Sequence, residues 1–201
     1  MVQYSRNQLH EKFKKGKEIS KLLAQLLEFG YTCRNTERTE YMTYEKLREE
    51  VRKANLVLVG LGEKLSADME SFYQSLAALL EEKDYFIVSL SDNRRALESV
   101  GLFSDRITVP LTEGETQESW EKYLHWLSFT LNQNLCILEL GVAFVHPEII
   151  RFPFEKTCYF NQKSKYIRIH ENFPQLSKEI AARGISVQED PVTFFTTGYR
   201  T

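Results

Sequence analysis

The chain has 201 residues, 42% of them hydrophobic, and its 26 Lys+Arg against 28 Asp+Glu give a formal net charge of −2. This length suits one domain, or one large domain with an appendage. The apolar fraction is enough for a full core, which excludes a disordered or collagen-like chain. A nearly neutral chain also argues against a dedicated nucleic-acid-binding protein, whose domain is usually basic. We therefore expect no nucleic-acid partner.

The N-terminal sequence has no apolar stretch of the kind found in signal peptides. The most apolar run, NLVLVGLG at 55–62, is far shorter than the roughly 20 residues of a membrane helix. We therefore expect a cytoplasmic protein with no membrane partner. Cys33, Cys136 and Cys158 are scattered and form no C-x-x-C pair. They are expected to be reduced and mostly buried, and three cysteines are too few for a four-cysteine zinc site.

Residues 1–53 are predicted to form an N-terminal helical region. Apolar residues recur at spacings of three and four between 8 and 29, which predicts an amphipathic helix that ends at Gly30. A polar connection over 31–43 leads to a second helix at 43–53. The region carries 12 Lys/Arg against 8 Asp/Glu, a mild excess that is typical of a solvated helical face. These helices are expected either to pack on the rest of the chain or to bind a protein partner or a second copy.

Residues 54–201 are predicted to form the main domain. Apolar, β-rich runs indicate strands, and amphipathic segments between them indicate helices. The strands are expected at 55–60, 85–90, 106–110, 135–140, 165–169 and 184–187, and the helices at 65–83, 94–100 and 115–131. This alternation predicts a three-layer Rossmann-like α/β fold with a mostly parallel sheet of five or six strands.

Ligands of such sheets bind beyond the carboxyl ends of the strands. The glycines Gly60 and Gly62 after the first strand, followed by Ser66, would let backbone N–H groups approach a phosphate. Two glycines also make an ordinary tight turn, so both interpretations stay open. After the second strand, Ser91 and Asn93 suit a ribose or an amide, and the alternative is a helix N-cap.

Two later strands add polar candidates. Gly141 follows the strand at 135–140, and within that strand Glu139 needs a buried partner, for which Arg151 or Arg168 is predicted. His170 and Glu171 follow the strand at 165–169. The four histidines show no H-x-x-x-H spacing, so no metal site is predicted.

Four segments resemble the sirtuins, the NAD-dependent protein deacylases, in the form found in bacterial firmicute and macrodomain-linked members. They are ANLVLVGLGEKLS (54–66), KDYFIVSLSDNR (83–94), NLCILELGVAF with PEIIRFPFEK (134–156), and KYIRIHENFPQLSKEIAARGI (165–185). The resemblance implies a DHS-like NAD/FAD-binding fold and a site for NAD, ADP-ribose or a related adenine nucleotide. The binding residues it implies are Gly60, Leu61, Gly62, Ser66, Ser91, Asn93, Gly141, Val142, His170 and Glu171.

The departures from the sirtuin pattern imply a pseudoenzyme without deacylase activity. Leu61 replaces a small residue, and Glu63 stands where the diphosphate would approach, which costs about 1 kcal/mol at 4 Å even in water. No histidine follows the third predicted strand, where sirtuins carry their catalytic base. The chain also leaves no segment for the cofactor loop, the helical insert or the zinc module, so no zinc is expected.

Three hypotheses follow. The first is an inactive sirtuin-like protein that keeps a nucleotide site. The second is an NAD-consuming enzyme, an ADP-ribosyltransferase or NAD hydrolase, with Asp92 or Glu113 as the acid/base group. The third is a non-catalytic interaction or homodimerising module that binds through its N-terminal helices, with a cleft filled by side chains such as Leu61 and Phe144.

Overall fold

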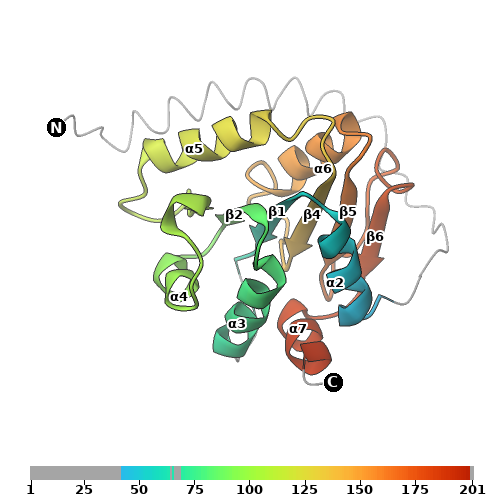
Figure 1. Cartoon of the computed structure of the whole chain (residues 1–201), viewed down its shortest axis with the longest axis horizontal. Coiled ribbons are helices and arrows are strands. Elements are labelled where there is room, and N and C mark those ends of the chain that lie inside the picture. The colour runs from blue at the N-terminus through green and yellow to red at the C-terminus, as the bar shows by residue number, and fades with distance from the viewer. Residues whose placement is uncertain (1–41, 64, 66–68, 200–201) are drawn as a thin grey trace. The chain divides into compact units, whose positions relative to one another are not determined.

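The computed structural model describes residues 42–63, 65 and 69–199; the helix expected at 8–29, Cys33 and Ser66 lie outside this part of the chain. Helices and strands alternate along most of the described chain (Figure 1). The elements are α2 (Tyr44–Lys53), β1 (Leu56–Leu61), α3 (Met69–Leu80), β2 (Asp84–Ser89), α4 (Arg94–Ser99), the 3-10 turn η1 (Ser104–Arg106), β3 (Ile107–Thr108), α5 (Gln117–Ser128), β4 (Leu135–Leu140), α6 (Arg151–Phe160), β5 (Lys165–Ile169), β6 (Gly184–Val187) and α7 (Pro191–Tyr199).

The strands form one six-stranded parallel sheet in the order β3-β2-β1-β4-β5-β6. The predicted Rossmann-like α/β fold is therefore confirmed. β1 and β4 lie at the centre, and they are almost entirely apolar because helices cover both faces of the sheet.

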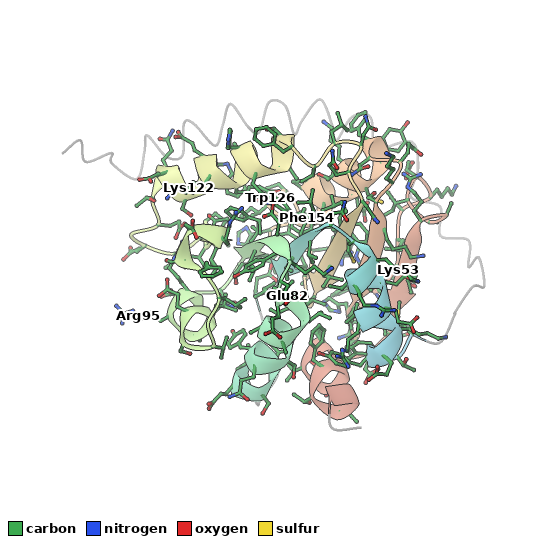
Figure 2. All side chains as sticks on the ribbon, in the orientation of Figure 1. Lys53, Glu82, Arg95, Lys122, Trp126 and Phe154 are labelled. Carbon is green, nitrogen blue, oxygen red and sulfur yellow. The ribbon has the colours of Figure 1, made fainter. Side chains whose placement is uncertain are left out.

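Alternate residues of each strand point to opposite faces, which divides the core into two apolar layers. Val59 and Leu138 belong to the layer beneath α2, α3 and α7. Leu58 and Ile137 belong to the layer beneath α5 and α6. Figure 2 labels Trp126 on α5 and Phe154 on α6, both of which are buried against this second layer.

Helix α2, predicted as part of the N-terminal helical region, packs on the main domain. Thr43 caps it, because its Oγ1 accepts a hydrogen bond from the Lys46 backbone N–H at 3.3 Å. Leu47 and Val51 are buried in the layer shared with α3 and α7. The Tyr44 hydroxyl donates to the Ser75 carbonyl at 3.2 Å. The apolar face of α2 is thus used within its own domain.

The structure differs from the predicted elements at several points. The strand expected at 106–110 is only Ile107–Thr108, and the helices α6 and α7 were not predicted. Both of these helices carry a proline in the first turn, Pro153 and Pro191, where a missing N–H breaks no helical hydrogen bond. Cys136 and Cys158 are buried free thiols, as predicted. Within the described residues, every helix is too short or too polar to cross a membrane.

Candidate functional site

The strand order reverses between β1 and β4, and this switch point is where open α/β sheets bind ligands. Four loops leave the carboxyl ends of the neighbouring strands. They begin after β1 at 62–63, after β2 at 90–93, after β4 at 141–146 and after β5 at 170–173. The predicted site residues that the structure describes lie in or beside these loops.

The loops after β1 and β4 touch each other, backbone against backbone. The Gly62 N–H donates to the Leu140 carbonyl at 2.9 Å, and a Cβ on Gly62 would lie 1.8 Å from the Gly141 carbonyl oxygen. Gly141 itself has φ +67°, a conformation that favours glycine. Both glycines are therefore explained by the close approach of the two loops.

Glu63 reaches across the switch point from the β1 loop. Its Oε2 accepts a long hydrogen bond from the Ala143 backbone N–H at 3.4 Å. Its Oε1 is buried and has no hydrogen-bond partner among the described residues. The carboxylate thus approaches a backbone N–H that could otherwise bind a phosphate.

Ser91 and Asn93 make contacts within the protein. The Ser91 hydroxyl lies 3.1 Å from the Gly62 carbonyl and 3.0 Å from the Glu63 carbonyl, so it holds the β1 loop. The Asn93 side-chain amide donates to the Tyr73 hydroxyl at 3.0 Å, and its Oδ1 is buried without a partner in the described chain. Burial raises the pKa of Tyr73, so that phenol stays protonated.

Three other predicted site residues serve the core. Gly60 lies within β1 facing α6, where a Cβ would meet the Ile150 Cγ2 at 2.5 Å. Leu61 and Val142 are fully buried, in the two opposite apolar layers. Their side chains present no surface to a ligand.

A buried ionic cluster lies beneath the β4 and β5 loops. We call it the Glu139 cluster; its members are Glu139, Arg151, Glu155, Tyr166 and Arg168. Glu139 accepts from the Arg168 Nε at 2.8 Å and lies 3.1 Å from the Arg151 guanidinium. The prediction that Glu139 pairs with one of these arginines is confirmed for both. The two carboxylates cancel the charge of the two guanidiniums, and this neutrality permits the burial of all four groups.

Burial sets the electrostatics of this cluster. It raises the pKa of Tyr166 well above its ordinary value, and Glu139 adds to this effect. It also lowers the pKa of Arg151, with Arg168 opposing and Glu139 favouring the charge. For Arg168, burial opposes the charge, but Tyr166 and the two carboxylates outweigh it and raise the pKa. Both arginines stay cationic, because a guanidinium does not lose its proton in proteins.

Above the cluster lies an aromatic rim, which we define as Phe144, His170 and Phe173. The Phe144 ring stacks on the Arg151 guanidinium, 4.2 Å from its carbon, and meets the Phe173 ring edge-on at 5.4 Å. The His170 ring lies 5.0 Å from Phe173. Phe144 is 48% exposed and Phe173 39% exposed, so the rim faces solvent.

Arg151 joins the two loops that make the rim. Its guanidinium donates to the Val142 carbonyl at 2.8 Å and to the Phe173 carbonyl at 3.1 Å. Sequence reasoning missed Phe173 and this role of Arg151. In the sequence, Phe173 is an aromatic residue shortly after a predicted strand. It indicates a site only once β4 and β5 are known to be neighbouring strands.

The remaining candidates lie apart from this rim or at its edge. Glu171 is exposed beside His170, and Asp92 and Glu113, the acid/base candidates of the enzyme hypothesis, are exposed on other loops. Across residues 42–63, 65 and 69–199, no three His, Cys, Asp or Glu side chains are grouped as metal ligands would be. The structure thus brings together His170, Phe144 and Phe173, and it places Gly62 and Gly141 in a loop contact.

Comparison with known proteins adds no relative. No protein-family model matches the chain, and no curated protein is significantly similar to it.

Proposed function

We propose that this protein is a non-catalytic, sirtuin-like module that binds an adenine nucleotide at the aromatic rim. The observation that supports it is the exposed pair Phe144 and Phe173, beside half-buried His170, next to the switch point of a parallel sheet. Ligand sites typically combine aromatic side chains with a few placed polar groups. A purine has a flat face suited to such rings.

His170 supplies the polar group. Its Nδ1 accepts two backbone hydrogen bonds, from Asn172 and Phe173, so the proton of the neutral ring is on Nε2. That N–H is a donor for a ring nitrogen or a ribose oxygen.

Glu63 favours the nucleoside part of the ligand over the diphosphate. Its carboxylate already approaches the Ala143 N–H, and repulsion of a phosphate costs about 1 kcal/mol in water and more in a dry site. We expect adenosine and AMP to bind at least as well as ADP-ribose and NAD. Replacing Glu63 by Gln should improve ADP-ribose binding about fivefold or more, which corresponds to that repulsion.

Calorimetry with adenosine, AMP, ADP-ribose and NAD tests the proposal. Stacking contributes about 1–3 kcal/mol per base, so Phe144→Ala and Phe173→Ala should each weaken binding roughly 5- to 150-fold. Phe129→Ala is the matched control, because Phe129 is another exposed phenylalanine, at 64%, outside the rim. The absence of binding at millimolar concentration of all four ligands would exclude the nucleotide site.

Mass spectrometry of NAD incubated with the protein separates this proposal from the enzyme hypothesis. We expect no nicotinamide release. Release that disappears in Asp92→Asn or Glu113→Gln would instead support an NAD-consuming enzyme.

A second candidate function is protein interaction, favoured by an exposed apolar patch at the ends of α5 and α6. We call it the α5–α6 patch; its members are Phe129, Leu131, Tyr159 and Phe160, between 48% and 64% exposed. The Asn161 side chain ties the two ends together by donating to the Thr130 and Gln133 carbonyls. Large apolar side chains exposed close together are typical of interaction sites. Light scattering of the wild type and of Phe129→Ser tests it: a monomer at every concentration would exclude homodimerisation.

A further inference from the structure

The side chain of His170 caps the turn that follows β5. Its Nδ1 lies 3.0 Å from the Asn172 backbone nitrogen and 3.1 Å from that of Phe173, and it accepts from both N–H groups. The backbone N–H of His170 is itself held by the Val187 carbonyl of β6 at 3.1 Å. The turn is thus anchored at its start, and its shape depends on a lone pair that only the neutral imidazole offers.

Four charged groups act electrostatically on His170. They are Arg151 of α6, Glu139 of β4, Arg168 of β5 and Glu171 in the turn itself. Burial is the largest cause of the lowered pKa of His170. The two arginines lower the pKa further, and the two carboxylates raise it. A proton on Nδ1 would meet two N–H donors and two nearby cations.

We propose that the turn at 170–173 is a pH-sensitive latch for the aromatic rim, in which protonation of His170 at Nδ1 frees the Asn172 and Phe173 N–H groups. The freed turn moves the Phe173 ring off Phe144, and the Phe173 carbonyl leaves Arg151. The latch regulates the same rim as the proposed nucleotide site, and it is a property of the ligand-free protein.

The sign of the pH dependence follows from the lowered pKa. The folded state binds fewer protons at His170 than the unfolded chain does, so the latch contributes its full stability above the ordinary histidine pKa of about 6.5. That contribution is lost as the pH falls through the lower pKa of the folded protein. In the ligand-free protein, Phe173 therefore stays against Phe144 above the ordinary histidine pKa and leaves it as the pH falls through the lowered pKa of His170.

Nuclear magnetic resonance of the ligand-free full chain tests this, by titration from about pH 7.5 downward until the His170 ring signal has completed its transition. We expect the Asn172 and Phe173 amide signals to shift with the same midpoint as the His170 ring. Hydrogen exchange of these two amides, corrected for its intrinsic pH dependence, should rise about tenfold or more below that midpoint.

Three variants make the test specific. His170→Asn keeps an acceptor for the same N–H groups, because an asparagine oxygen closes such turns, but it does not titrate. The two amides should then stay protected at every pH. His170→Ala should leave them unprotected at every pH. His146→Asn is the control, since His146 is a partly exposed histidine on the β4 loop, 3.6 Å from Glu148, and its loss should leave the transition unchanged.

The latch is refuted if the Asn172 and Phe173 amides do not follow the His170 titration. It is equally refuted if His170→Asn shows the same pH response as the wild type, because Glu171 or another carboxylate would then be responsible. Since no nucleotide is present, either result leaves the nucleotide proposal standing. Failure of nucleotide binding in turn leaves the latch standing.

Discussion

Removing the charge of Glu139 is the most direct test of how the carboxyl edge is held together. Glu139 is completely buried, and its two oxygens contact both guanidiniums of the Glu139 cluster and the Tyr166 hydroxyl. In Glu139→Gln, Arg151 and Arg168 are left with only Glu155 to balance them. The buried cluster then carries one uncompensated positive charge.

The expected loss is large, because removing one partner of a buried ion pair costs about 3–5 kcal/mol. A domain of this size has a free energy of unfolding of about 5–15 kcal/mol. The variant should therefore still fold, but with a much smaller free energy of unfolding. At a urea dependence of about 2 kcal/mol per molar, the unfolding midpoint should fall by about 1.5–2.5 M.

Urea unfolding followed by circular dichroism and by tryptophan fluorescence measures this loss. Glu118→Gln is the control, since Glu118 forms an exposed ion pair with Lys122 at 3.0 Å and should cost less than about 1 kcal/mol. The charge-balanced double variant Glu139→Gln/Arg151→Gln should lose less than the sum of its single variants, by about 1–3 kcal/mol.

Two results would refute this reasoning. One is a Glu139→Gln variant that unfolds within about 1 kcal/mol of the wild type, which would mean that the cluster is hydrated or rearranges at no cost. The other is simple additivity in the double variant. If Glu139→Gln does not fold at all, its loss exceeds the free energy of unfolding of the domain, which agrees with a large cost of the uncompensated charge.

Three further predictions concern stability and reactivity. Gly62→Ala should lower the free energy of unfolding, measured by calorimetry, by about 1–3 kcal/mol, because its Cβ would lie 1.8 Å from the Gly141 carbonyl oxygen. A variant as stable as the wild type would show that the two loops separate freely. Burial raises the pKa of Cys136 to about 12. Iodoacetamide at neutral pH should therefore leave this thiol unmodified until the protein unfolds, as peptide mapping would show. Modification of the native protein would contradict the burial of Cys136. Thr43→Ala should cost about 1 kcal/mol in thermal unfolding by removing the cap on the Lys46 N–H, and Thr43→Ser should restore it.

Much of the fold could be predicted from local sequence because continuous apolar runs identify buried strands. The runs at 55–60 and 135–140 became the central strands β1 and β4, almost at the predicted boundaries. Alternation with amphipathic helices was enough to predict a parallel sheet. The short helices α6 and α7 escaped prediction, because each buries only a few side chains and carries a proline that usually marks a helix end.

Composition and patterning by themselves determined the fold class, the burial of the thiols and the need of Glu139 for a cationic partner, since these follow from which residues avoid water. Only the tertiary structure decided how the edge of the sheet is used. The β4–β5 register pairs Glu139 with Arg168, and α6 brings in Arg151 as well. The same packing presses Gly62 against Gly141 and brings Phe144 to Phe173, contacts that depend on strand register and loop approach rather than on neighbouring residues in the chain.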